Sequence, residues 1–207
     1  SRQGWAPAVG TVGGSSTPSA ATRSRSSRMI FWAPLRPMPG TCVTVTLEGR
    51  RPLLAEVQAL VARNLSPNVR RTTIGMDPSR TLMIVAVLQN SIKIPLYEKD
   101  VYVSTVWEPT ADLAVALAIA SASANRNFPG RVVALGEVGL AGDLRRVPGL
   151  ERRLAEAARL GFTDAITPLP PPGVQVSVPK GMRLAQVPSL NDALATLDLR
   201  PQRPSRP

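Results

Sequence analysis

The side chains that most often perform catalysis are scarce in this chain. Its 207 residues include no histidine and a single cysteine, Cys42. These counts exclude Ser-His-Asp and Cys-His catalysis, histidine-ligated metals, an internal disulfide and a cysteine-based zinc site. No G-x-x-x-x-G-K-[ST] loop occurs, and none of the lysines follows a glycine. We therefore expect no ATP hydrolysis by a P-loop.

Arginine is the one functional residue type that gathers locally. The cluster comprises Arg145, Arg146, Arg152, Arg153 and Arg159. Guanidinium groups stay charged and bind phosphates through paired donors, so the cluster predicts contact with a nucleic-acid backbone, which Arg126 and Arg131 would extend. A solvated face with local pairs to Glu151 and Glu156, or a subunit interface, is the alternative interpretation. Aromatic residues are only 4% of the chain, which argues against base stacking.

The net charge of +11 is unevenly distributed. Five arginines and no acidic residue precede Glu48, and three more arginines lie in residues 200–207, which leaves +3 for the middle of the chain. Residues 1–38 form a basic Ser/Pro/Arg-rich segment that we expect to be disordered, with a transit peptide or a gene-model artefact as alternatives. We expect a folded domain over 39–199 and a disordered Pro/Arg tail over 200–207.

The folded part alternates between the strand and helix patterns. Strands are expected over 42–47, 53–61, 70–74, 100–106, 131–135 and 165–167, the first two as a hairpin. Helices are expected from 77 through 88, over 110–124, over 150–160 and over 189–197. This order predicts a single α/β or α+β domain of about 160 residues. No stretch of about 18 residues is free of charges and turn breakers, so we expect no transmembrane helix.

Local signals refine these elements. Asp77, Thr110 and Ser189 are expected to act as helix N-caps. The helix through residues 81–88 is apolar on nearly every side, which predicts deep burial. In the helix over 150–160, Leu150, Leu154 and two alanines share one face. The glycine-rich run 136–142 is interpreted as a tight turn between strands rather than a dinucleotide-binding loop, because its spacing is not G-x-G-x-x-G.

Several blocks of sequence carry a family resemblance. They lie at residues 45–61, 70–73, 100–103, 108–118, 136–142 and 151–162. With them, residues 40–197 resemble the C-terminal Lon-protease-like domain of the RadA (Sms) family of DNA repair ATPases. The zinc module, the RecA-like core and the K-N-R-F-G motif of that family are absent from this sequence. The two-glycine turn of the family is also missing beside Trp107.

The resemblance implies a Lon-like mixed sheet with packed helices and a degenerate active site. Lon proteases use a serine nucleophile activated by a lysine, and the matching positions here are Thr110 and Glu151. A carboxylate cannot replace the lysine amine in this role. The resemblance therefore implies a domain without catalytic activity, in which Thr110 serves as a helix cap.

The resemblance also implies a role in recombinational DNA repair. The implied partners are duplex or branched DNA, further copies of the chain in a ring, or a RadA-type ATPase, with no cofactor and no membrane. The implied location is the bacterial cytoplasm, associated with the nucleoid, with a plastid or mitochondrion as the alternative. Alternative functions are a Lon-like peptidase, a purely structural oligomerisation domain and a truncated product.

Overall fold

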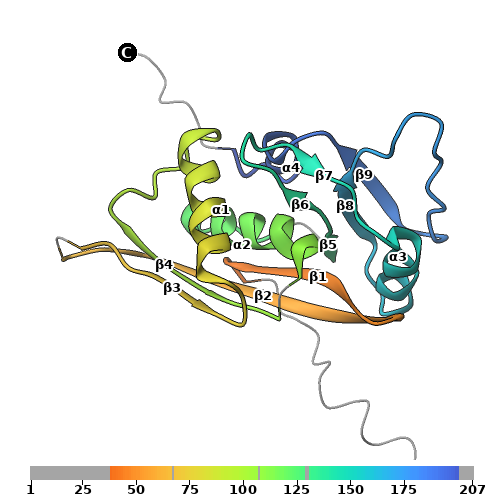
Figure 1. Ribbon diagram of the computed structural model, residues 1–207, viewed down its shortest axis with the longest axis horizontal. Coiled ribbons are helices and arrows are strands. Elements are labelled where there is room, and N and C mark those ends of the chain that lie inside the picture. The colour runs from red at the N-terminus through yellow and green to blue at the C-terminus, as the bar shows by residue number, and fades with distance from the viewer. Residues whose placement is uncertain (1–37, 67, 107, 129–130, 201–207) are drawn as a thin grey trace, which may run out of the picture. The chain divides into compact units, whose positions relative to one another are not determined.

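A seven-stranded mixed sheet organises the chain in the computed structural model, which describes residues 38–66, 68–106, 108–128 and 131–200 (Figure 1). The strand order is β3-β4-β2-β1-β5-β8-β9. The bounds are β1 Thr41–Glu48, β2 Arg51–Arg63, β3 Arg71–Ile74, β4 Lys99–Ser104, β5 Val132–Ala134, β8 Asp164–Pro168 and β9 Arg183–Val187. Strand β2 runs antiparallel to its two neighbours, and the other pairings are parallel. The predicted mixed α/β fold is confirmed.

The helices are α1 Pro78–Asn90, α2 Asp112–Ala124, α3 Leu150–Arg159 and α4 Leu190–Thr196, with a 3-10 turn at Pro109–Ala111. Helices α1, α2 and α4 share one core with Cys42 and Val57 of the sheet. Helix α3 packs on β1 and β2 beside Leu47, whose side chain points to the opposite face from Cys42 because strand residues alternate. The sheet is therefore covered on both faces near β1.

Helix α2 is the centre of the main core. Its residues from Asp112 to Ser121 are all buried, and alternating small and branched side chains let it lie close to the strands beneath it. Helix α1 differs from the prediction of burial on nearly every side, because Leu82 is 52% exposed and Ala86 is also exposed. One face of α1 has no described element packed over it. The apolar composition of the helix therefore predicted more burial than the structure shows.

Most predicted elements are confirmed, including the β1–β2 hairpin, β3 and β4. Asp77 and Ser189 cap α1 and α4 through their side chains, as expected. Strand β9 was missed. The glycine-rich turn is confirmed, and it joins two short strands, β6 Glu137–Val138 and β7 Leu144–Arg145, which form a separate small sheet.

Of the predicted tails over 1–38 and 200–207, all residues but Met38 and Arg200 lie outside the described part of the chain, as does Trp107 beside the missing turn. Within the described part of the chain, no helix has the length and apolar character needed to cross a membrane.

Candidate functional site

The arginine cluster predicted around α3 does not form a single surface. Arg145, Arg146, Arg152 and Arg159 are exposed, whereas Arg153 is only 3% exposed. The prediction that Arg153 contacts a nucleic-acid backbone is therefore wrong, because its side chain is buried.

Arg153 instead links three segments beneath α3. Its guanidinium forms an ion pair with Glu108 and donates to the carbonyl oxygens of Pro148, at 2.9 Å, and Val45. It also donates to the hydroxyl of Thr110 at 3.1 Å. This network joins the start of α3 to β1 and to the 3-10 turn, so Arg153 has a structural role.

The predicted cap at Thr110 is also wrong. The residues in the N-cap positions of the 3-10 turn and of α2 are Glu108 and Ala111, and neither makes a side-chain cap hydrogen bond. The Thr110 hydroxyl donates to the Glu108 carboxylate, and the other oxygen of that carboxylate accepts from the backbone N–H of Leu47 at 3.1 Å. Thr110 therefore belongs to the Arg153 network.

The two residues at the degenerate dyad positions have separate partners. Thr110 is buried, with 6% exposure, and contacts Glu108 and Arg153. The Glu151 carboxylate is exposed and accepts from the backbone N–H of Ser177 at 2.9 Å. Because each polar group is engaged elsewhere, this arrangement provides no base for the Thr110 hydroxyl other than Glu108, which is already paired with a guanidinium.

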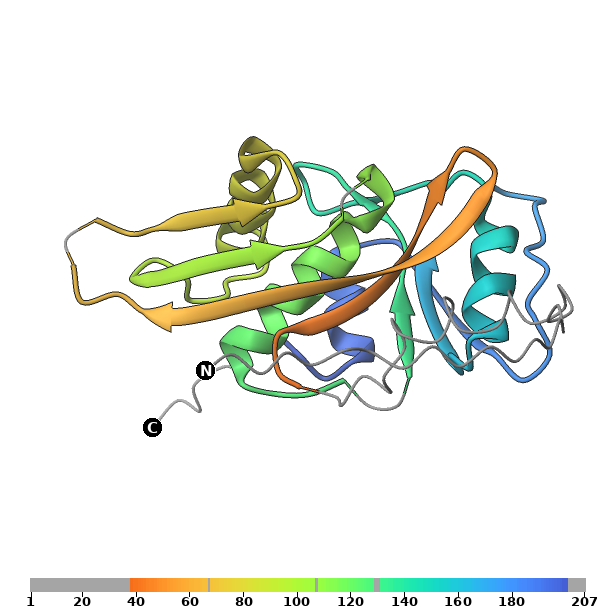
Figure 2. The same ribbon diagram turned by 90° about the horizontal axis from the view of Figure 1, so that it is seen from below.

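Two arginines from the β1–β2 turn join the exposed side of α3. The Arg152 guanidinium lies 3.5 Å from the carbonyl oxygen of Arg50. Arg159 donates two hydrogen bonds to Glu156 and lowers the pKa of that carboxyl, and the nearby charge of Arg51 lowers it further. We call Arg50, Arg51, Arg152 and Arg159 the α3 basic face. Figures 1 and 2 both show the β1–β2 turn beside α3.

The charges in this region are only partly neutralised. Arg159 is paired with Glu156, and Arg145 lies 3.4–3.5 Å from Asp143 and Glu137. Arg50, Arg146 and Arg152 form no ion pair with the described residues. The free positive charge is therefore concentrated at the β1–β2 turn and the beginning of α3.

Arg126 and Arg131 are held by partners away from the α3 basic face, and only the charge of Arg126 is neutralised by an ion pair. Arg126 pairs with Asp198, and Arg131 stacks over the ring of Phe162 and donates to the carbonyl oxygen of Leu160. Sequence reasoning missed Arg50 and Arg51 as members of the site. Their turn was recognised, but nothing in the sequence placed it beside a helix about a hundred residues away.

A second charged network holds the β6–β7 hairpin to the helices. Asp112 is completely buried at the start of α2, and one of its carboxylate oxygens accepts from Arg80 and from the backbone N–H of Val138. Arg80 also donates to the carbonyl oxygen of Val138 at 3.1 Å and pairs with Glu137. The hydrogen bond to Asp112 raises the pKa of the Arg80 guanidinium. This network is structural, since it joins α1, α2 and β6.

The reactivity of the Cys42 thiol tests whether this residue is buried in the core. Burial raises the pKa of its thiol from an ordinary 9.0 to about 12. The thiolate is the reactive form, so we expect no reaction with Ellman's reagent in mildly alkaline native buffer and complete reaction in concentrated guanidinium chloride. Rapid labelling of the native protein would contradict this placement.

The same burial affects stability at high pH. Because the folded chain keeps a proton that the unfolded chain releases, this thiol's contribution to the free energy of unfolding should fall as the pH rises above 9.0.

Among the described residues, no three His, Cys, Asp or Glu side chains come together in a way that could hold a metal ion.

Comparison with known proteins relates this domain to a longer protein. A family model described as subunit ChlI of Mg-chelatase matches residues 108–170. DNA repair protein RadA of Mycolicibacterium smegmatis is 51% identical over 165 residues, covering 77% of this chain and 34% of that protein. RadA of Mycobacterium tuberculosis is 52% identical over 137 residues, covering 64% of this chain and 28% of that protein. RadA of Escherichia coli is 40% identical over 164 residues, covering 77% of this chain and 35% of that protein.

The chain thus spans about a third of the length of these curated relatives. These sequence matches establish that about 77% of the chain is homologous to DNA repair protein RadA.

Proposed function

We propose that this chain acts in recombinational DNA repair as a domain that contacts the DNA backbone and performs no catalysis. The repair role rests on the relatives, each named DNA repair protein RadA. The observation that carries the DNA contact is the α3 basic face, where two chain segments distant in sequence bring their arginines together.

The chemistry of this face favours phosphate over bases. Arg50 and Arg152 have no acidic partner among the described residues, so their donors are available to a phosphate oxygen. Contacts of this kind position a duplex without reading its sequence. We therefore expect binding that depends steeply on salt and weakly on sequence.

The absence of catalysis is the second part of the proposal. It is supported by the separate engagement of Thr110 and Glu151, because a nucleophile must lie within hydrogen-bond reach of its base. The Glu108 carboxylate beside Thr110 is itself held by the Arg153 guanidinium and the backbone N–H of Leu47.

The partners form the third part of the proposal. The relatives extend well beyond the matched region, so we infer that the domain works with a RadA-type ATPase and with further copies of itself in a ring. Duplex or branched DNA would be the ligand, no cofactor would bind this domain, and the setting would be the cytoplasm of a bacterium, at the nucleoid.

The DNA contact is tested by a salt titration of duplex binding with the full chain. In the Arg50→Gln/Arg152→Gln variant, the slope of log K against log salt should fall by up to about 1.8, because each phosphate contact contributes about 0.9. The matched control is Arg63→Gln/Arg70→Gln, which removes the same charge where β2 ends and β3 begins, far from α3 (Figure 2). The basic tails are identical in both variants, so equal slopes in the two would contradict the proposal.

A further inference from the structure

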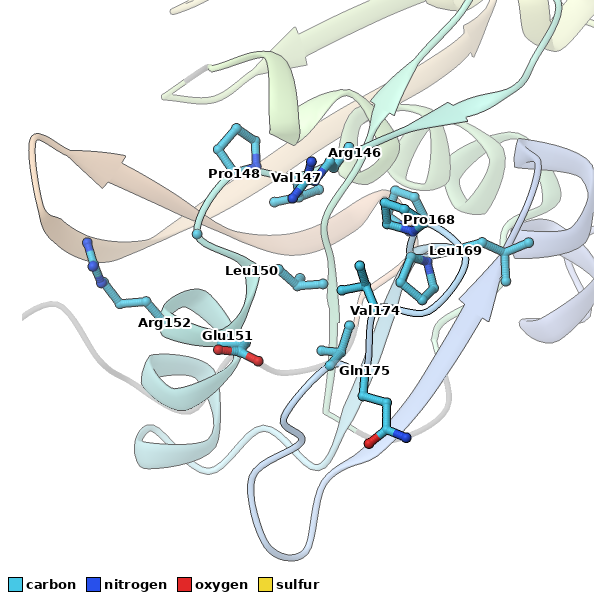
Figure 3. Close-up of a pocket in the computed structure, with 14 residues that line it drawn as sticks. Arg146, Val147, Pro148, Leu150, Glu151, Arg152, Pro168, Leu169, Val174 and Gln175 are labelled. Atoms are coloured by element: carbon cyan, nitrogen blue, oxygen red, sulfur yellow. The ribbon is translucent and has the colours of Figure 1, made fainter.

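A groove of about 620 Å³ separates the beginning of α3 from the loop that follows β8 (Figure 3). One wall is formed by residues 146–152 and the other by Pro168–Pro171 and Val174–Val176. In Figure 3, Leu150 and Val174 face each other across the groove, with Leu169 and Pro168 above them. The volume lies in the range of sites that hold several side chains or a small ligand.

The lining of the groove is apolar and partly open to solvent. Leu169 is 52% exposed and Val174 is 46% exposed, so apolar surface of both side chains is left in contact with water. Four prolines, at positions 148, 168, 170 and 171, stiffen the two walls. A rigid wall loses little conformational entropy when a ligand binds, so the groove is well suited to accept apolar side chains.

More positive than negative side chains line the groove. Arg146 and Arg152 line it, and neither forms an ion pair with a described residue. Glu151 also lines it, but its carboxylate accepts the backbone N–H of Ser177 and thereby holds the chain beyond the groove. An occupant therefore meets apolar walls together with two available guanidinium groups.

We propose that this groove binds an extended segment of a partner protein in which apolar side chains alternate with acidic ones. The apolar side chains would occupy the space between Leu150, Leu169 and Val174, and the carboxylates would pair with Arg146 and Arg152. This inference goes beyond the proposed DNA contact, since it assigns a protein ligand to a different surface and shares only Arg152 with the α3 basic face.

Nucleic acid fits the groove less well than a peptide. The described lining contains no aromatic side chain on which a base could stack. Phosphates would leave Leu169 and Val174 in contact with water and charge, so burying these apolar groups requires apolar side chains on the ligand. The composition of the groove therefore favours a peptide that carries both kinds of side chain.

The test uses the full chain and three short fluorescent peptides of equal length. One alternates leucine with aspartate, one alternates glycine with aspartate, and one alternates leucine with lysine. We expect the Leu-Asp peptide to bind about tenfold more tightly than the Gly-Asp peptide, because one or two leucine side chains become buried. The Gly-Asp peptide measures simple attraction to the basic tails, and the Leu-Lys peptide should bind least.

A pair of variants locates the site. Leu169→Asn/Val174→Asn, which removes the apolar walls without adding charge beside Arg152, should abolish the preference for Leu-Asp over Gly-Asp while leaving the melting temperature and the salt slope of duplex DNA binding unchanged. The control is Leu60→Asn/Leu65→Asn, which makes the same kind of change at two other exposed apolar residues, 59% and 94% exposed, and should keep the preference. Equal binding of Leu-Asp and Gly-Asp, loss of the preference in Leu60→Asn/Leu65→Asn, or loss of DNA binding in the groove variant would each overturn the proposal.

Discussion

Replacing Arg153 with alanine should lower the free energy of unfolding by about 3–5 kcal/mol. The side chain is 3% exposed and satisfies Glu108, the Thr110 hydroxyl and two backbone carbonyl oxygens. Its removal leaves the Glu108 carboxylate without its cation in a largely buried position and empties the space beneath α3. Breaking a buried ion pair from one side is costly because the remaining charge stays desolvated.

The neighbouring arginine provides the control for this prediction. Arg152→Ala should change the free energy of unfolding by no more than about 0.5 kcal/mol, because the side chain is exposed and has no ion pair among the described residues. Urea denaturation of both variants gives the comparison. Equal stability of the two would show that Arg153 does not form the buried network.

Replacing Asp112 with alanine should also cost about 3–5 kcal/mol. Asp112 is completely buried, and its loss would leave the Arg80 guanidinium and the Val138 N–H without the acceptor they share. The hairpin β6–β7 would then lose its attachment to the beginning of α2. We expect urea denaturation to show this loss as a lower midpoint.

Two further variants make the result specific. Asp198→Ala removes a carboxylate that also pairs with an arginine, Arg126, but is 84% exposed, so it should cost less than about 1 kcal/mol. The double variant Arg80→Met/Asp112→Leu should be more stable than Asp112→Ala, because it also removes the partly buried guanidinium that has lost its main acceptor. If Asp112→Ala were no more costly than Asp198→Ala, the network would not be a source of stability.

The elements that could be predicted from the sequence are those with local signals. The β1–β2 hairpin has alternating side chains around a charged turn, and Asp77 and Ser189 have side chains that satisfy the first N–H groups of their helices. Strand β9 carries no such signal. Its five residues, Arg183–Val187, are recognisable only through parallel pairing with β8, which depends on the tertiary fold.

The error at Arg153 could have been avoided from the sequence. Leu150, Arg153, Leu154 and Ala157 follow the i, i+3, i+4, i+7 spacing of a single helix face, so Arg153 lies on the apolar side of α3. Charge alone suggested exposure, and the helical period indicated burial. A buried arginine needs acceptors from other segments, here Val45 and Glu108, and their proximity could not be inferred from local sequence.

The groove and the α3 basic face also could not be predicted from local sequence, because each is formed by segments that are distant in the chain. Arg50 and Arg152 are about a hundred residues apart in the chain, and Leu150 meets Val174 only because β8 lies between them in sequence and returns the chain to α3. The matched RadA proteins provide the biological context of repair. The described contacts place Arg153 inside the domain and leave Arg50 and Arg152 on its surface, where we propose that they contact DNA.

The most direct test of the central claim is a nuclear magnetic resonance titration of the nitrogen-15-labelled full chain, 22.0 kDa, with duplex DNA. If the α3 basic face binds the DNA backbone, the amide signals of residues 49–52 and of α3 should shift first and saturate together, and higher salt should reverse the shifts. Shifts confined to residues 1–37 and 201–207, with the signals around α3 unmoved, would contradict the account and assign DNA affinity to the tails alone.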